Sequence, residues 1–177
     1  MRAYVSMSIW STLFGQGCLM LMARSVPDEF SLKANCDVAF PRRTSKCTAA
    51  VIFRNHLGKV IDGCYISCHA KSSLEGELLA IRVACLLVSR KSFTGTHIVS
   101  DNKQAILLSV SELDLPWAVN AIVWDIRHIS KEWGVSFSWV PRLGNQSAHV
   151  AANLASRGKL PCNWLSKPPF PSCPGFM

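Results

Sequence analysis

Three acidic residues stand at positions where an isolated carboxylate is unfavourable. Asp37 lies inside the alternating stretch at residues 32–40, which predicts a β-strand, although Asp is disfavoured in strands. Glu77 falls within the apolar stripe of a predicted helix, and Asp101 ends a short apolar segment that predicts another strand. A buried carboxylate needs a hydrogen-bond donor, a cation or a metal ion as its partner. These acids are therefore the first candidates for chemistry.

Each acid also has a purely structural interpretation. Asp37 would need no partner on the polar face of an edge strand, and Glu77 would need none if it reached sideways to water. Asp101 precedes a predicted helix and could serve only as its N-cap. Open α/β sheets, however, gather their binding residues at strand ends.

The elements that must position these acids follow from periodicity and turn residues. Strands are predicted at residues 32–40, 47–54, 60–67, 97–100 and 135–140, and helices at 72–89, 102–111, 116–133 and 145–157. Short links predict that the first three strands form an antiparallel meander. Val135, Phe137 and Trp139 share one face of the last strand, Asn145 is the predicted cap of the last helix, and Gly158 ends that helix.

Composition indicates a globular chain with a basic surface. Of the 177 residues, 49% are hydrophobic and 17% are charged, which excludes a disordered protein. The formal net charge of +8 suits an anionic partner such as nucleic acid or an acidic membrane surface. The basic residues are scattered, so charge alone does not identify the partner.

The eight cysteines do not form an obvious disulfide framework or zinc motif. Cys36 and Cys85 fall on apolar positions, where a free cysteine packs as a small hydrophobe. Cys64, Cys68 and His69 are close in sequence, but no second ligand pair has zinc-like spacing. We expect reduced cysteines and an intracellular protein, in the nucleus or the cytoplasm.

The ends of the chain differ from its middle. Residues 1–30 contain an apolar run that is too short to span a bilayer and lacks a good signal-peptide cleavage site. We expect a poorly ordered leader over residues 1–30, one domain over 31–160 and a Pro-rich tail over 161–177. No membrane association and no obligate protein partner are expected.

Several motifs occur together and in a familiar order. They are KANCDVAF at residues 33–40, AVIFRNHLG at 50–58, EGELLAIR at 75–82, VSD at 99–101, VPRLGNQSAH at 140–149 and LA at 154–155. With the order of elements, they resemble the ribonuclease-H-like domain of plant non-LTR retroelement reverse transcriptases, within the RNase H type-1 family. The resemblance covers residues 32–164. It implies an α/β ribonuclease H-like fold, in which helices flank a mixed sheet of three antiparallel strands followed by two parallel ones.

The resemblance also implies a site. Asp37, Glu77 and Asp101 would be three of four acids that bind two Mg²⁺ or Mn²⁺ ions. In the family's sheet the first strand is central and the fourth strand lies beside it in parallel, which would bring Asp37 and Asp101 together. The family's fourth acid falls at His149. Clustered carboxylates suit Mg²⁺, whereas imidazole is a poor ligand for Mg²⁺ and acceptable to Mn²⁺.

Two functions remain open on this resemblance. The first is a metal-dependent endonuclease that hydrolyses the RNA strand of RNA–DNA hybrids. The second is a module that binds hybrids or RNA and has lost much of its catalysis, which the histidine at position 149 supports. In both, nucleic acid is the partner.

Overall fold

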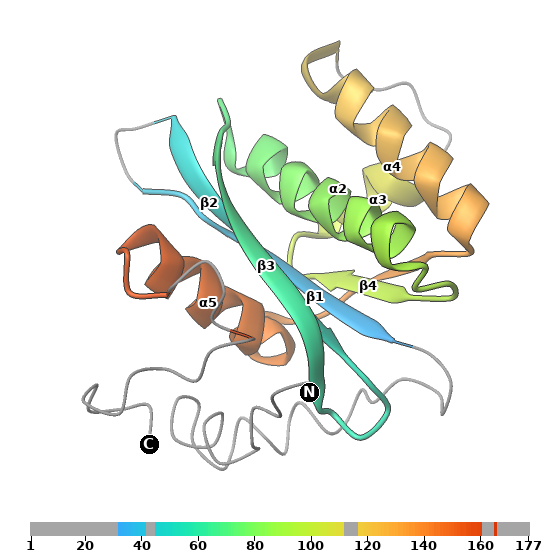
Figure 1. The fold of residues 1–177 in the computed structure, drawn as a ribbon. Coiled ribbons are helices and arrows are strands. Elements are labelled where there is room, and N and C mark those ends of the chain that lie inside the picture. Colours follow the sequence, from blue (N-terminus) through green and yellow to red (C-terminus); the bar gives the residue numbers. More distant parts are fainter. Residues whose placement is uncertain (1–31, 42–44, 112–116, 161–164, 166–177) are drawn as a thin grey trace.

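The computed structural model describes residues 32–41, 45–111, 117–160 and 165. A five-stranded sheet in the order β3-β2-β1-β4-β5 carries helices on both faces (Figure 1). The expected leader (1–30) and most of the expected tail (161–177) lie outside the described residues, so those two predictions stay predictions.

The first three strands form the predicted antiparallel meander. They are β1 (Lys33–Ala39), β2 (Lys46–Arg54) and β3 (Val60–His69). Asn55 stabilises the turn between β2 and β3, because its side-chain oxygen accepts hydrogen bonds from the backbone N–H groups of Leu57 and Lys59. Gly58 follows at φ +71°, a left-handed conformation that glycine adopts without a steric penalty.

Two parallel strands complete the sheet on the other side of β1. They are β4 (His97–Ser100), which pairs with β1, and β5 (Ser136–Trp139), which pairs with β4. The strand that carries Asp37 is therefore central, and all seven of its residues are buried. The edge-strand interpretation of Asp37 is wrong, because neighbouring strands and helices cover β1 on every side.

Most of the helices lie on one face of the sheet. α2 (Ser73–Lys91) crosses β1 and β2, and α3 (Lys103–Val110) and α4 (Asn120–Trp133) pack beside it (Figure 1). The Ser72 hydroxyl accepts the Glu75 N–H and caps α2. The main core lies between α2 and alternate residues of the sheet: Ala34, Cys36, Ala49, Val51 and Phe53.

The last helix, α5 (Gln146–Ser156), covers the opposite face of the sheet (Figure 1). Ala151 and Ala152 pack against Ala50 and Ile52 in a second, smaller core. Gly158 follows the helix at φ +68°, and its N–H bonds to the Ala155 carbonyl, as expected of a helix stop.

Two details of the sequence interpretation are corrected. Asn145 stands at the start of α5, but its side chain makes no cap hydrogen bond, because it points into the protein interior. The helix predicted from residue 116 begins with a 3₁₀ turn at Trp117–Val119. Trp139, at the end of the edge strand β5, is 41% exposed. No helix in the described ranges is long and apolar enough to cross a membrane.

A carboxylate cluster at the end of the central strands

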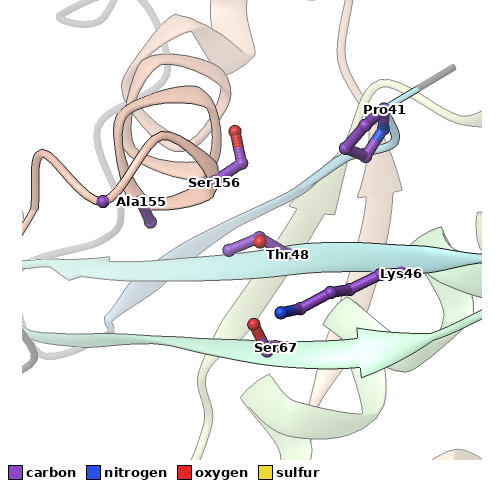
Figure 2. Close-up of a pocket in the computed structure, with 7 residues that line it drawn as sticks. Pro41, Lys46, Thr48, Ser67, Ala155 and Ser156 are labelled. Atoms are coloured by element: carbon purple, nitrogen blue, oxygen red, sulfur yellow. The ribbon is translucent and has the colours of Figure 1, made fainter. Parts of the chain in front are cut away.

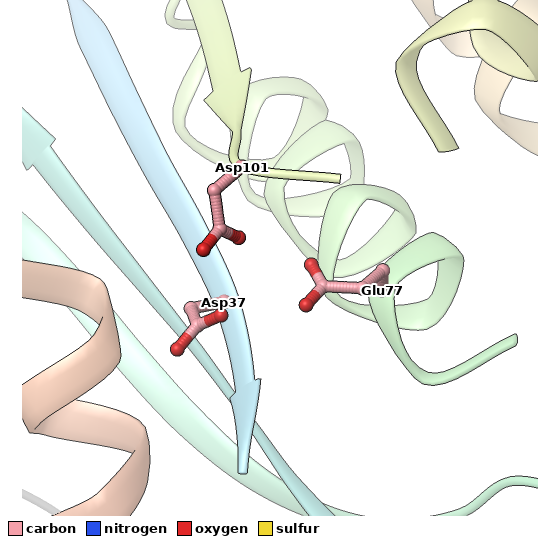
Figure 3. Close-up of side chains that lie close together, drawn as sticks. All are labelled: Asp37, Glu77 and Asp101. Atoms are coloured by element: carbon pink, nitrogen blue, oxygen red, sulfur yellow. The ribbon is translucent and has the colours of Figure 1, made fainter. Parts of the chain in front are cut away.

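The structure brings Asp37, Glu77 and Asp101 together. One carboxylate oxygen from each lies within 4.8 Å of the others, and the three side chains point toward one another from β1, α2 and the end of β4 (Figure 3). Asp37 is 2% exposed and Glu77 is 5% exposed. The interpretation of Glu77 as a residue at the solvent boundary is therefore wrong.

The fold explains this proximity. Because β1 and β4 run in parallel, their carboxyl ends lie at the same edge of the sheet, and Asp101 is the first residue after β4. Asp101 is not the cap of α3, since the Asn102 side chain accepts the Ala105 N–H.

Glu77 reaches the cluster because α2 lies close to β1. A Cβ atom placed at Gly76 would lie 3.3 Å from both methyl groups of Val38, the neighbour of Asp37. A glycine at this position therefore allows the first turns of α2 to approach the central strand.

The three acids are electrostatically unfavourable without a cation. Burial, together with the negative charges of Asp37 and Asp101, raises the pKa of Glu77 to about 9. Burial also raises the pKa of Asp101, with a second contribution from Asp37, while Arg142 acts to lower it. The Ser100 hydroxyl donates to Glu77 at 3.1 Å. Three carboxylates at this close range repel one another when ionised, so the cluster fits a bound cation.

His149 joins the cluster from α5. Its Nδ1 lies 2.8 Å from Oδ2 of Asp37, and an ionised carboxylate only accepts, so Nδ1 is the donor. The Nη2 atom of Arg142 lies 3.1 Å from both ring nitrogens. An atom equidistant from both nitrogens lies on the N–H axis of neither, so the guanidinium packs against the ring. The position predicted for a fourth ligand thus lies beside Asp37, and its role as a ligand stays a prediction.

A buried amide network holds the start of α5 against β1. The Asn145 side chain donates to the Cys36 carbonyl at 2.7 Å and accepts from the Asn35 amide at 2.9 Å. Arg54 in turn donates to the Asn35 side-chain oxygen at 2.7 Å. Sequence reasoning missed this network, because asparagines beside turns and helix starts are usually caps.

The exposed rim of the cluster is basic on the Asp101 side. Arg142 lies 3.6 Å from the Asp101 carboxylate, and its side chain is 62% exposed. Trp139 donates its indole N–H to the Asp101 carbonyl, and the Lys103 ammonium lies 4.4 Å from the centre of the Trp139 ring. These contacts were not predicted, although Arg142 lies within the motif at residues 140–149.

The donor set fits a hard divalent cation. Among the described residues, these three acids form the only cluster of three or more metal-binding side chains, and all their donors are carboxylate oxygens. Cys64, Cys68 and His69 form no such cluster. A shallow pocket between α5 and strands β2 and β3 contains none of the acids (Figure 2); its lining includes Lys46, Thr48, Ser67 and Ser156.

Solved structures share this fold at low sequence identity. The RNase H1 of the halophilic archaeon Halobacterium salinarum NRC-1 is 15% identical with a TM-score of 0.66, and the match covers 72% of this chain and 98% of that one. An N-terminal RNase H domain from Mycobacterium tuberculosis is 13% identical with a TM-score of 0.64, over 73% of this chain and 95% of that one. LC11-RNase H1, solved in complex with an RNA/DNA hybrid, is 14% identical with a TM-score of 0.61, and the match covers 70% of this chain and 94% of that one.

The family is established by sequence. No curated protein matches the chain. The model of one family, described as reverse transcriptase-like, matches residues 35–155, which include all three acids and His149. The fold is that of ribonuclease H, as expected, and the chain belongs to the reverse transcriptase-like family.

Proposed function

We propose that this protein is a divalent-metal-dependent ribonuclease that cleaves the RNA strand of RNA–DNA hybrids, with Asp37, Glu77 and Asp101 as metal ligands. The observation that carries the proposal is the approach of three largely buried carboxylates to within 4.8 Å at the carboxyl ends of two parallel strands. A purely structural cluster would need cationic partners of its own. Arg142 at 3.6 Å from Asp101 is too exposed to neutralise all three acids.

The residues around the cluster suit a phosphodiester substrate. Bound Mg²⁺ or Mn²⁺ ions would supply an activated water and would neutralise charge on the phosphate. The exposed guanidinium of Arg142 is free on its outer side to contact a phosphate next to the cleaved bond. Ser100 and His149 orient Glu77 and Asp37 through hydrogen bonds of 3.1 and 2.8 Å.

The choice of an RNA–DNA hybrid rests on likeness and charge. LC11-RNase H1 was solved with an RNA/DNA hybrid, and this chain shares its fold. The formal net charge of +8 favours a polyanionic partner. We extend that substrate class to this chain as part of the proposal.

A second function is favoured by His149. An imidazole bonded to Asp37 adds no negative charge where a fourth carboxylate would, so a second Mg²⁺ ion would be held weakly. On this basis the alternative is a nucleic-acid-binding module with weak or no catalysis. It predicts hybrid binding without cleavage in Mg²⁺.

A cleavage assay separates the two functions. A hybrid with labels on both strands is incubated with protein in Mg²⁺, in Mn²⁺ and in EDTA, and binding is measured in parallel. The ribonuclease proposal expects cleavage of the RNA strand alone, abolished by EDTA and reduced at least about 100-fold in Asp37→Asn. Asp125→Asn, a matched change at the Arg82 ion pair on α4, should retain activity. Binding without cleavage in either metal ion would instead support the second function, and equal activity in Asp37→Asn would exclude the proposed site.

A further inference from the structure

Two cysteines face each other across β2 and β3, which are neighbouring strands of the meander. Cys47 on β2 is the register partner of Cys68 on β3, and their sulfur atoms lie 3.0 Å apart. Both are free thiols in the structure. They lie on the face of the sheet that α2 covers, against Val38, Ala70 and Leu79.

The strand register provides the geometry of a disulfide. Ala70 donates its N–H to the Ser45 carbonyl, so Ser45 and Ala70 form a hydrogen-bonded pair of the antiparallel ladder. Such pairs alternate along a ladder, so Cys47 and Cys68, two positions further along, are hydrogen-bonded as well. The Cα atoms of such pairs are about 5.5 Å apart, at the preferred separation for a disulfide of about 5.5–6 Å. The two sulfur atoms, now 3.0 Å apart, must approach by about 1 Å to form the bond.

The other described cysteines lack this arrangement. Cys64 shares the face and the strand of Cys68, but its register partner on β2 is Val51. Cys36 and Cys85 are fully buried in the main core. Among the cysteines that the structure describes, only the 47/68 pair combines register, sulfur contact and access, since Cys68 is half-buried.

We propose that Cys47 and Cys68 are a site of reversible oxidation, at which a small-molecule disulfide such as glutathione disulfide converts the dithiol into an intramolecular disulfide. The Cys68 thiol loses its proton, and its sulfur attacks one sulfur of the small disulfide and releases one thiol. The Cys47 sulfur, after losing its proton, attacks Cys68 in the mixed disulfide and releases the second thiol. Two protein thiols are oxidised and one small disulfide is reduced to two thiols.

The environment sets the order of the two steps. Cys47 is 1% exposed, so an external disulfide reaches Cys68 first. Burial, and then the hydrogen bond with Cys68, raise the pKa of the Cys47 thiol to about 12, which disfavours its direct reaction with an external reagent. In the second step, the contact with Cys68 compensates for the raised pKa of Cys47, because attack by an adjacent sulfur is intramolecular and has a high effective concentration.

The test uses the full-length protein and glutathione disulfide, followed by peptide mapping without reduction. Mapping is needed because Cys18, Cys162 and Cys173 lie outside the described residues. The expected product is a peptide pair joined through Cys47 and Cys68, two hydrogens lighter, which dithiothreitol separates again. It should form at least about tenfold faster in native buffer than in denaturant, where the register is lost.

Three alanine variants make the result decisive. Cys47→Ala should stop at the first step and keep a glutathione on Cys68, whereas Cys68→Ala should leave Cys47 unmodified. Cys64→Ala, the control on the same strand face, should behave as wild type. The proposal is overturned if the wild type retains glutathione on Cys68 as Cys47→Ala does, if Cys68 joins another cysteine instead, or if the native protein does not react. The test does not depend on the proposed nuclease activity.

Discussion

The imidazole of His149 donates from Nδ1 to Oδ2 of Asp37 across 2.8 Å, and this bond joins α5 to the acid on the central strand. It has two consequences for metal binding. One oxygen of Asp37 is shared with a hydrogen-bond donor, and the only other nitrogen with which His149 could bind a metal is Nε2. If the proposed metal site holds two ions, we expect weak binding of Mg²⁺ at the second position for both reasons.

Replacing His149 by aspartate should therefore increase Mg²⁺-supported cleavage. The change adds a negative charge and hard oxygen ligands beside Asp37, and Arg142 is close enough to limit the added repulsion. We expect a gain of at least about tenfold in Mg²⁺ and a smaller gain in Mn²⁺, which accepts imidazole. The measurement is the initial rate on a labelled hybrid at several concentrations of each ion.

His149→Ala is the companion variant. If His149→Asp leaves the Mg²⁺ rate unchanged while His149→Ala lowers the rate in both ions, then His149 orients Asp37 and is not a substitute ligand. The Mg²⁺ dependence of the Asp variant distinguishes these two roles.

The raised pKa of Glu77 predicts how stability depends on pH without metal. The pKa is about 9 in the folded protein against a reference value of 4.5, so between these values the folded state holds a proton that the unfolded state lacks. Stability that comes from this proton is present below the lower value and is lost as the pH rises toward about 9. For one proton, the slope is at most about 1.4 kcal/mol per pH unit.

Urea unfolding in EDTA from pH 5 to 8 measures this effect. Glu77→Gln cannot ionise, so its free energy of unfolding should fall less with pH than that of the wild type. Mg²⁺ added at pH 8 should stabilise the wild type more than the variant, since the ion binds the ionised form. Parallel pH curves for the two proteins would show that Glu77 is ionised in the metal-free fold.

Asn145→Ala should destabilise the protein strongly. The side chain is 0% exposed, and its removal leaves the Cys36 carbonyl and the Asn35 amide without this partner in the interior. We expect a loss of about 2–4 kcal/mol in the free energy of unfolding. Asn120→Ala, at the exposed start of α4, should cost less than about 0.5 kcal/mol. Equal losses in the two variants would mean that the network does not contribute.

Hybrid binding should weaken steeply with salt, and Arg142 should account for part of this dependence. Arg142→Gln removes an exposed cation beside Asp101, so the slope of log affinity against log salt should become shallower by about one. Arg157→Gln, at the opposite end of α5, is the matched control and should leave the slope closer to that of the wild type. Binding that does not change with salt would argue against phosphate contacts and against nucleic acid as the partner.

Local sequence patterns were sufficient to predict the strands and helices and to single out the three acids as candidate site residues. Each element could be predicted because its buried residues recur at the period of a strand or a helix. This holds for the alternation at residues 32–40, for the apolar stripe that contains Glu77 and for the short strand before Asp101. The structure differs from those ranges by only a few residues at their ends. The cost of burying a carboxylate then marked the acids as candidates without any knowledge of their partners.

Only the tertiary structure decided what each polar side chain touches. The same alternating pattern at residues 32–40 suits an edge strand or a central one, and the pairing of β1 with both β2 and β4 made it central. Asn145 has the sequence context of a cap, yet the packing of α5 on β1 turned its amide toward Cys36. The 3.0 Å contact between Cys47 and Cys68 depends on the β2–β3 register. Contacts between segments far apart in the chain depend on register and packing, which no short window of sequence contains.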